Sequence, residues 1–337
     1  MKEKGKKITI YDVAKAAGCS TATVSLVLHN DKRIKEETRN KVRECIKTLN
    51  YKPSYLARSL AIQRTQSIGI IVPEMTNPVF SELVHGAEGY LSQNGYNVII
   101  GSTNQDLDKE KLYLDMLSGK KVDGLIILPT FLSEIEDKLK DMQAMHFPFV
   151  VTGVKSSMKN VNYVSTNKVE GAFIGVEHLI HRGHKNIAFV RGSEVEEHSS
   201  ERLEGYIKAL NVYGIPFRED YIIKSRQDFS DVREKVRGFK KEHPEVTALF
   251  CLYDFIAMAV MKALYDLKLS IPKDVAVVGY DNIQLGEYLP VGLTSIDGNN
   301  YKVGEIAARI LVNQITSDAE EIQHIILTPK LVIREST

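Results

Sequence analysis

Short apolar runs alternating with amphipathic stretches most strongly constrain what this chain of 337 residues can fold into. The runs have the length of buried strands, and the stretches between them carry apolar residues at helical spacing. Strands joined through helices lie parallel, so the pattern predicts parallel sheets covered by helices. The predicted strands are Ile68–Val72, Asn97–Gly101, Gly124–Leu128, Phe149–Val151, Ile187–Val190, Ala248–Cys251 and Val275–Val278. The predicted helices are Phe80–Asn94, Asp108–Ser118, Glu134–Met145, Val169–Arg182, Arg202–Tyr213, Val232–Lys241 and Ile256–Leu267.

The strands fall into two series, which predicts an α/β body of two doubly wound parallel sheets. Such sheets bind ligands outside the carboxyl ends of their strands. Two sheets that face each other across a cleft would bury a small molecule between them. The body of the chain is therefore expected to hold a ligand site.

The front of the chain has a different pattern, which begins with Thr9–Asn30. Thr9 is suited to cap a first helix, and Asp12 completes a capping box. Gly18 ends that helix, and Ser20 can cap a second one directly afterwards. This is helix-turn-helix spacing. The helices would close through apolar stripes made by Val13, Ala14, Ala17, Val24 and Leu28, which leaves Thr21, Ala22, Ser25 and Leu26 facing outwards.

A third helix is predicted over Glu36–Leu49, with an apolar face that roofs the first two helices. After Pro53, the stretch Ser54–Ala61 favours helix but is far shorter than a helix that is stable alone in water. Another surface must therefore stabilise this short segment.

The distribution of charged residues also separates the front of the chain from its body. Residues 1–64 hold fifteen Lys or Arg against six Asp or Glu, which leaves twenty-nine against thirty-seven for the rest. A basic arm on an acidic body is typical of nucleic-acid binding. Cys19, Cys45 and Cys251 have no metal-like spacing and indicate a reducing compartment. With no apolar run of membrane-spanning length, we expect a cytoplasmic protein without a membrane partner.

The front resembles the LacI/GalR (lactose and galactose repressor) family in ITIYDVAKAAG, STATVSLVL, ETRNKVRECIKTLNYKPS and LARSL. The body resembles it in IGIIVPEMTNPVFSEL, VDGLIILP, HLIHRGHKNIAFVRG, ERLEGYIKAL, LFCLYDFIAMAVMKAL, DVAVVGYDN and LTSIDGN. The resemblance implies a DNA-binding domain over residues 1–64 with a hinge helix at about 53–61. It implies an effector-binding and dimerisation domain over 65–337 like a periplasmic binding protein. One lobe would comprise about 66–165 plus 292–322, and the other about 166–291 plus 323–337.

In that family the second helix reads the major groove, and the hinge places a leucine in the minor groove. Carried over by position, Thr21, Ala22 and Leu26 would read bases and Leu60 would be the wedge. Leu26 stands where the family usually carries Arg or His, so we expect apolar contact with a thymine methyl. Lys35 replaces the usual Ser or Thr cap of the third helix, which should weaken that cap. The full expected DNA contact set is Thr9, Tyr11, Ser20, Thr21, Ala22, Thr23, Ser25, Leu26, Asn30, Arg33, Tyr51, Ser54, Ala57, Arg58 and Leu60.

The effector residues follow from strand-end position and from the resemblance. Arg202 offers forked donors and Asp281 offers acceptors for hydroxyl protons, which suits a carbohydrate between aromatic rings. Gly153 stands where many relatives carry Asp, and Tyr253 replaces a common Asn, so the pocket should have its own shape. The expected effector contacts are Asn77, Phe80, His198, Arg202, Phe229, Tyr253, Asp254 and Asp281.

For several of these residues, a purely structural role stays open as an alternative to ligand or DNA contact. Leu60 or Phe229 could be plain packing, Asn77 a helix cap, and His198 a solvated loop residue. Likewise, Asp281 could cap a loop, and Arg202 could form a salt bridge between the lobes or along its helix.

The resemblance implies a repressor that binds a palindromic operator as a homodimer and is released by a sugar or sugar derivative. A regulator that needs a corepressor or partner protein is the nearest alternative, and a soluble sugar-binding protein with a basic arm is a further one. His178, His181 and His184 are interrupted by Gly183, so no metal is expected. The sequence has no P-loop, no strand-linked GxGxxG and no GxSxG elbow, and nothing in it supports an enzyme or a cofactor, so neither is expected.

Overall fold

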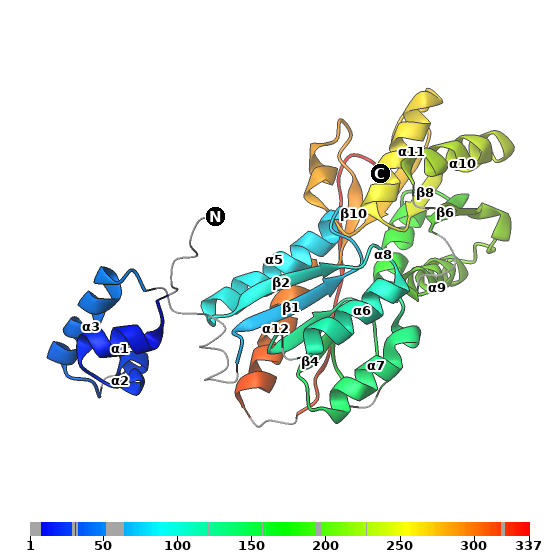
Figure 1. The fold of residues 1–337 in the computed structure, drawn as a ribbon. Helices are drawn as coiled ribbons and strands as arrows, with labels where there is room; N and C mark the ends of the chain where they lie inside the picture. The colour runs from blue at the N-terminus through cyan, green and yellow to red at the C-terminus, as the bar shows by residue number, and fades with distance from the viewer. Residues whose placement is uncertain are drawn as a thin grey trace, which may run out of the picture. The chain divides into compact units, whose positions relative to one another are not determined.

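The structure is a computed structural model that describes residues 8–28, 31, 33–51, 64–119, 121–156, 158, 160–192, 197–226, 228–317 and 321–337, with only the backbone of 197–199. It divides into a unit of residues 1–65 and a unit of residues 66–337. Figure 1 shows the elements of both units.

The first unit contains α1 (Ile10–Ala17), α2 (Thr21–Leu28) and α3 (Glu36–Thr48). The described residues form a small core in which Val13, Val24 and Val42 are fully buried. Val27 is buried as well, whereas Leu28, the predicted core residue, only packs against the edge of the cluster. On the second helix, Val24 was therefore predicted correctly and Val27 takes the place expected for Leu28, and the helix-turn-helix prediction is confirmed.

The second unit is built on two sheets, and the predicted α/β fold with doubly wound parallel sheets is confirmed. The first sheet has the order β11-β5-β4-β3-β1-β2 and is parallel throughout. Its strands are β1 (Ser67–Val72), β2 (Asn97–Ser102), β3 (Gly124–Ile127), β4 (Phe149–Thr152), β5 (Asn162–Thr166) and β11 (His324–Leu327).

Helices cover both faces of the first sheet because successive strand residues point to opposite sides. Ile68, Ile70 and Val72 pack towards α5 (Pro78–Gln93) and α12 (Asn300–Thr316). Ile71 packs instead with the cluster formed by α6 (Leu107–Ser118) and α7 (Leu132–Ala144). The layers can be followed in Figure 1.

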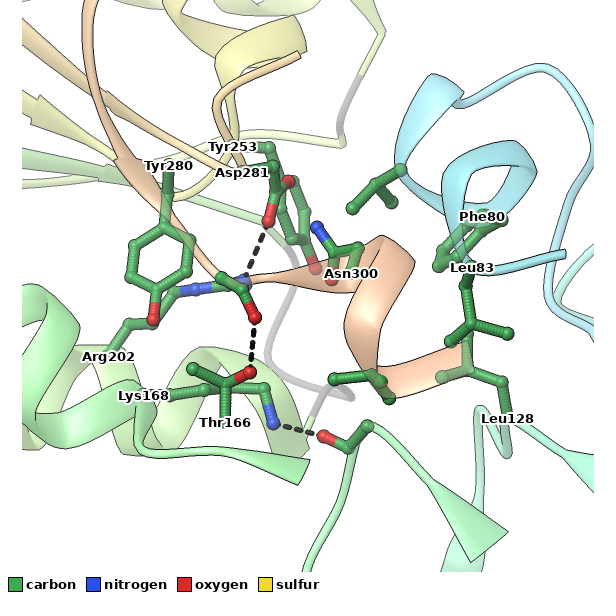
Figure 2. Close-up of a pocket in the computed structure, with 14 residues that line it drawn as sticks. Phe80, Leu83, Leu128, Thr166, Lys168, Arg202, Tyr253, Tyr280, Asp281 and Asn300 are labelled. Atoms are coloured by element: carbon green, nitrogen blue, oxygen red, sulfur yellow. Dashed lines mark hydrogen bonds and ion pairs between the residues drawn. The ribbon is translucent and has the colours of Figure 1, made fainter. Parts of the chain in front are cut away.

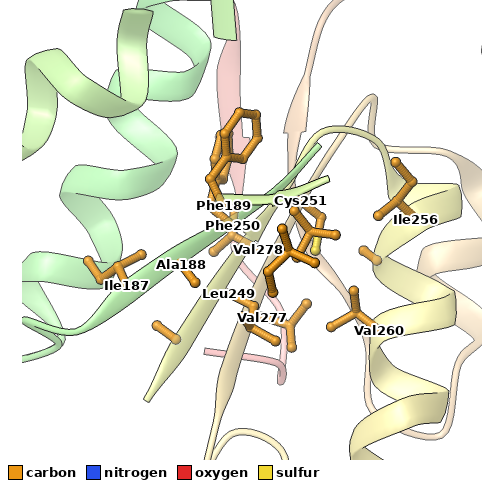
Figure 3. Packing of buried hydrophobic residues seen from close by; sticks show 14 of the residues in the cluster. Ile187, Ala188, Phe189, Leu249, Phe250, Cys251, Ile256, Val260, Val277 and Val278 are labelled. Carbon is orange, nitrogen blue, oxygen red and sulfur yellow. The ribbon is translucent and has the colours of Figure 1, made fainter. Parts of the chain in front are cut away.

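The second sheet has the order β12-β10-β9-β8-β6-β7, and only its edge strand β12 is antiparallel to its neighbour. The strands are β6 (Ile187–Arg191), β7 (Ile222–Lys224), β8 (Ala248–Cys251), β9 (Ala276–Tyr280), β10 (Thr294–Asp297) and β12 (Lys330–Val332). The helices are α8 (Lys168–His181), α9 (Glu197–Val212), α10 (Phe229–Glu242) and α11 (Asp254–Asp266), with short 3-10 turns at Glu219–Tyr221 and Gln284–Tyr288. Figure 3 shows part of the buried cluster of this lobe, with Phe189 and Phe250 from the strands and Ile256 and Val260 from α11.

The chain passes between the two lobes at three places, after β5, after β10 and after β11. The second crossing follows Asp297 rather than position 292, because β10 pairs in parallel with β9 of the second lobe. The third follows Leu327 rather than position 322, because β11 pairs with β5 of the first lobe. Both crossings therefore follow a strand, β10 or β11, that the predicted boundaries had placed after the crossing.

Candidate functional site

A cavity of about 70 Å³ lies between the two lobes of the second unit, at the carboxyl ends of their strands. The first lobe contributes Phe80 and Leu83 from α5 and Leu128 after β3. The second lobe contributes Arg202 from α9, Tyr253 before α11 and Asp281 after β9. Figure 2 shows these side chains facing the cavity from both sides.

Arg202 is the central donor of this cavity. Its guanidinium lies 3.9 Å from the centre of the Tyr280 ring and 4.8 Å from the centre of the Tyr253 ring. One of its nitrogens, Nη2, donates to Oδ1 of Asp281 at 3.2 Å. Both Nε and Nη1 are buried without a hydrogen-bond partner among the described residues. Buried donors of this kind are costly to leave unpaired, which favours a partner from outside the described residues, such as water or a ligand.

Asp281 supplies the matching acceptor. Its Oδ2 is buried and has no partner within the described part of the chain. Burial raises the pKa of Asp281 to about 7, and the positive charge of Arg202 opposes that rise. The backbone φ of Asp281 is 105°, a strained value that persists only where surrounding contacts hold it.

Asp254 provides part of that support and is not among the residues that line the cavity. Its carboxylate accepts from the Ser295 hydroxyl at 2.5 Å and from the Ile283 amide at 2.8 Å. Ser295 also accepts from the amide of Asn282 at 3.0 Å. Asp254, which the sequence analysis assigned to the effector, therefore holds the turn that carries Asp281.

Lys168 is a cavity residue that the sequence analysis missed. Its ammonium group is buried directly after the first crossing and donates to the carbonyl of Gly153 and, at 3.1 Å, to Glu201 of α9. Glu201 also lies 3.6 Å from Lys155 of the first lobe. Burial lowers the pKa of Lys168 to about 8, while the charge of Glu201 opposes that fall. These charges join the two lobes beside Arg202.

A second cavity of about 340 Å³ shares Phe80 and Tyr253 with the first one. Asn77 lines it while its Oδ1 accepts from the Val79 amide at 3.2 Å, so Asn77 is both a helix cap and a wall residue. Phe229 is 39% exposed and packs edge-on against Phe255 of this cavity, at 4.5 Å between ring centres.

The structure thus brings Phe80, Arg202, Tyr253 and Asp281 together in one cavity and places Asn77 in the adjoining one. The side chain of His198 lies outside the described residues. Tyr280, Thr166 and Asn300 also line the first cavity and were not predicted. Tyr280 ends a buried strand, and Thr166 and Asn300 stand at crossings, where the sequence carries no local signal.

The helix-turn-helix unit has the predicted caps. The Thr9 amide donates to the Asp12 carboxylate at 2.8 Å, and the Thr23 amide donates to the Ser20 hydroxyl at 3.1 Å. Gly18 ends α1 with a φ of 62°, and the Cys19 amide donates to Ala14 at 3.0 Å. This is the turn that sets α2 against α1.

The expected base readers lie on α2. Ala22 is exposed, and Thr21, Ser25, Leu26 and Thr23 are half-buried. Tyr11 on α1 is 74% exposed, Thr9 and Ser20 are exposed, and Tyr51 is half-buried. Arg33 pairs with Asp31 through Nη2 at 2.7 Å. Asn30, Ser54, Ala57, Arg58, Leu60 and the predicted hinge helix at 53–61 lie outside the described residues.

Within the described ranges no group of His, Cys, Asp and Glu side chains is arranged to hold a metal ion. In the same ranges no helix is both long and apolar enough to cross a membrane.

A helix-turn-helix unit joined in one chain to a two-lobed ligand-binding fold defines a DNA-binding transcriptional regulator. Residues 65–335 match the periplasmic binding proteins and sugar binding domain of the LacI family, and residues 9–54 match the bacterial regulatory proteins of the lacI family. The chain belongs to the LacI family, and its role is that of a transcriptional repressor and not of an enzyme.

Relatives and solved structures agree with this assignment. The chain is 34% identical to the HTH-type transcriptional repressor PurR of Aliivibrio salmonicida, with 97% of this chain and 98% of the relative covered. It is 33% identical to catabolite control protein A of Priestia megaterium, with 98% and 99% covered. The lac repressor dimer bound to operator and the anti-inducer ONPF matches with a TM-score of 0.87 and 25% identity over 98% of this chain and 99% of that one. The complex of the transcriptional regulator CelR with cellobiose matches with a TM-score of 0.74 and 26% identity over 98% and 100%.

Proposed function

We propose that this repressor acts in the cytoplasm, binds a palindromic operator as a homodimer, and is released from DNA by a sugar or sugar derivative. Residues 1–64 would bind the operator, and residues 65–337 would bind the effector and form the dimer. One recognition helix contacts only a few base pairs, whereas two helices related by two-fold symmetry read a palindrome.

The arrangement of Arg202 and Asp281 carries the effector proposal. Among the described residues, Nε, Nη1 and Oδ2 of this pair are buried without a partner beside a cavity flanked by aromatic rings. Two donors and one acceptor fit the vicinal hydroxyl groups of a carbohydrate, and the rings fit its apolar faces. The similar CelR structure contains cellobiose, and a similar LacI-family regulator from Enterococcus faecium contains ribose, which supports this ligand class.

The switch would act through the relative angle of the lobes. A ligand held by Arg202 from one side and Phe80 from the other changes that angle and, with it, the pairing of the first lobes in the dimer. The hinge segments with Leu60 then fold together on DNA or separate. A coupling of about 1–3 kcal/mol would change operator affinity roughly 5- to 150-fold.

On the operator, Thr21, Ala22 and Leu26 would contact base edges. The side chain of Leu26 has no group that can hydrogen-bond to guanine. We therefore propose that it contacts the methyl group of a thymine. The other expected contacts, including Tyr11, Ser20 and Arg33, would position the unit on the phosphates.

Fluorescence anisotropy on a labelled palindromic operator at fixed salt tests the proposal. Neutral sugars, sugar phosphates and nucleobases are added in turn. A neutral sugar should raise the dissociation constant at least fivefold. Failure to prefer any operator over random DNA would refute the operator assignment.

A second candidate is a regulator whose ligand or partner protein strengthens operator binding. The similar identity to PurR and to catabolite control protein A favours it. The anisotropy titration separates the two, because the dissociation constant falls instead of rising.

A further inference from the structure

The cavity that holds Arg202 and Asp281 is small. At about 70 Å³ it falls well short of the 300–1,000 Å³ of most ligand pockets. The adjoining cavity, at about 340 Å³, lies within that range. Phe80 and Tyr253 line both spaces, so a ligand held by Arg202 can extend past these two rings into the second cavity.

The second cavity is built from strand ends and not from a loop surface. Glu74 follows β1, Asn104 and Gln105 follow β2, and Thr130 follows β3. Asn104 and Gln105 have φ values of 53° and 57°, and the Gln105 amide donates to Pro73 at 3.1 Å. These contacts fix the turn that presents both amide side chains.

Thr130 places a buried hydroxyl group beside this cavity. The residue is only 9% exposed, and its Oγ1 is buried without a partner among the described residues. Its backbone amide donates to Glu110 at 3.2 Å, which holds the residue in place. A fixed, buried and unpaired hydroxyl beside a cavity is costly unless a ligand or water pairs with it.

The charges of the second cavity select against anions. Glu74 and Asp228 place two carboxylates on the wall. Among the described residues on the wall, Arg226 is the only cation, and its Nη2 lies 3.5 Å from Asp231. A phosphate group would therefore meet like charge, whereas neutral hydroxyl groups would find acceptors and donors. The ring of Phe255, backed by Phe229, offers an apolar face.

We propose that the second cavity is a subsite for a second sugar ring, so that the effector is an uncharged di- or oligosaccharide. Its first ring binds Arg202 and Asp281, its linkage passes between Phe80 and Tyr253, and its second ring binds Thr130. This inference rests on the proposed sugar effector and narrows it to ligands of at least two rings without a phosphate.

Calorimetric titration of the full-length protein tests the subsite. The probes are neutral disaccharides, their component methyl monosaccharides and the corresponding sugar 6-phosphates. Wild-type protein should bind one disaccharide at least tenfold more tightly than either component. Thr130→Val removes the hydroxyl and keeps the shape, so it should weaken that disaccharide about 5- to 12-fold and leave the monosaccharide unchanged.

Thr152→Val is the matched control, because Thr152 is buried in the same lobe and lines neither cavity. It should leave both affinities unchanged. Equal losses for disaccharide and monosaccharide in Thr130→Val, or tighter binding of the phosphates, would overturn the subsite.

The same titrations separate this inference from the proposed function. If monosaccharides bind and release the repressor from the operator, and disaccharides bind no more tightly than they do, the sugar effector is supported and the subsite is refuted. If no saccharide binds and the operator response needs another ligand class, both fail.

Discussion

Arg202 and Asp281 approach to 3.2 Å with side chains that are each only 5% exposed. A buried ion pair gains little net stability, because desolvation of both charges offsets their attraction. This pair also leaves a carboxylate oxygen and two guanidinium nitrogens without a partner in the part of the chain that the structure describes. Its geometry is therefore better explained by ligand binding than by folding.

Replacing Arg202 by Ala should abolish the ligand response and leave operator affinity within about twofold of wild type. The guanidinium lies in the second unit, and the helix-turn-helix core belongs to the first. Anisotropy with and without the active sugar measures both quantities. An undiminished response would remove Arg202 from the effector site.

Glu110 should make stability depend on pH. It is fully buried, and burial raises its pKa from 4.5 to about 7. The folded state therefore holds the proton of Glu110 more tightly than the unfolded state does. Its contribution to the free energy of unfolding is fully present below pH 4.5 and is lost as the pH rises through about 7.

Glu110→Gln cannot ionise and should lose that dependence. Relative to wild type, it should gain up to about 3 kcal/mol in unfolding free energy between pH 4.5 and pH 8. Urea unfolding at several pH values measures the gain, with the exposed Glu88→Gln as control. A constant difference across this range would contradict the prediction.

Gly304 should be intolerant of a side chain because α12 meets α5 there. A Cβ atom at this position would lie 2.0 Å from the Leu83 carbonyl oxygen. The helices would have to separate, so we expect Gly304→Ala to cost about 1–3 kcal/mol.

Gly238 in α10 is the matched control, since a Cβ atom there meets nothing within 4 Å. Gly238→Ala should stabilise by about 0.5–1 kcal/mol. If the packing is as described, chemical denaturation should give changes in unfolding free energy of opposite sign for the two variants. Equal changes would contradict the described packing.

Glu201→Gln should destabilise the contact between the lobes. Lys168 would stay buried with the Gly153 carbonyl but without a carboxylate, and breaking a buried pair costs about 3–5 kcal/mol. Partial exposure of Glu201 should bring the loss to the lower end of that range. The melting temperature measures it, and the exposed Glu204→Gln on the same helix should have little effect.

Lys35→Ser should strengthen the start of α3. Lys35 occupies the N-cap without a side-chain capping bond, as expected from its residue type. A serine there should stabilise by about 0.5–2 kcal/mol. Slower amide hydrogen exchange in α3 would support this, and unchanged exchange would contradict it.

Local patterns were enough to predict the fold class. The capping box at Thr9 and the glycine at position 18 defined the helix-turn-helix, and alternating apolar runs defined both sheets. The strands β5, β7, β10, β11 and β12 were missed, because they are short or lie at crossings and edges, where pairing depends on distant segments.

The residues that line the cavity between the lobes were predicted in part. Strand-end position pointed to Phe80, Arg202, Tyr253 and Asp281, which lie together. It also pointed to Asp254, yet the direction of that carboxylate is set by Ile283 and Ser295, which are remote in sequence. Lys168 could have been suspected only from the position of the first crossing.

The three crossings of the chain between the lobes determine how the two lobes are encoded in the gene. Each lobe takes strands from both sides of α12, and β11 and β12 complete different sheets near position 330. No continuous part of the reading frame therefore encodes a whole lobe. A ribosome must add the edge strands of both lobes within a few residues of each other, so each sheet gains its last strand at nearly the same moment of synthesis.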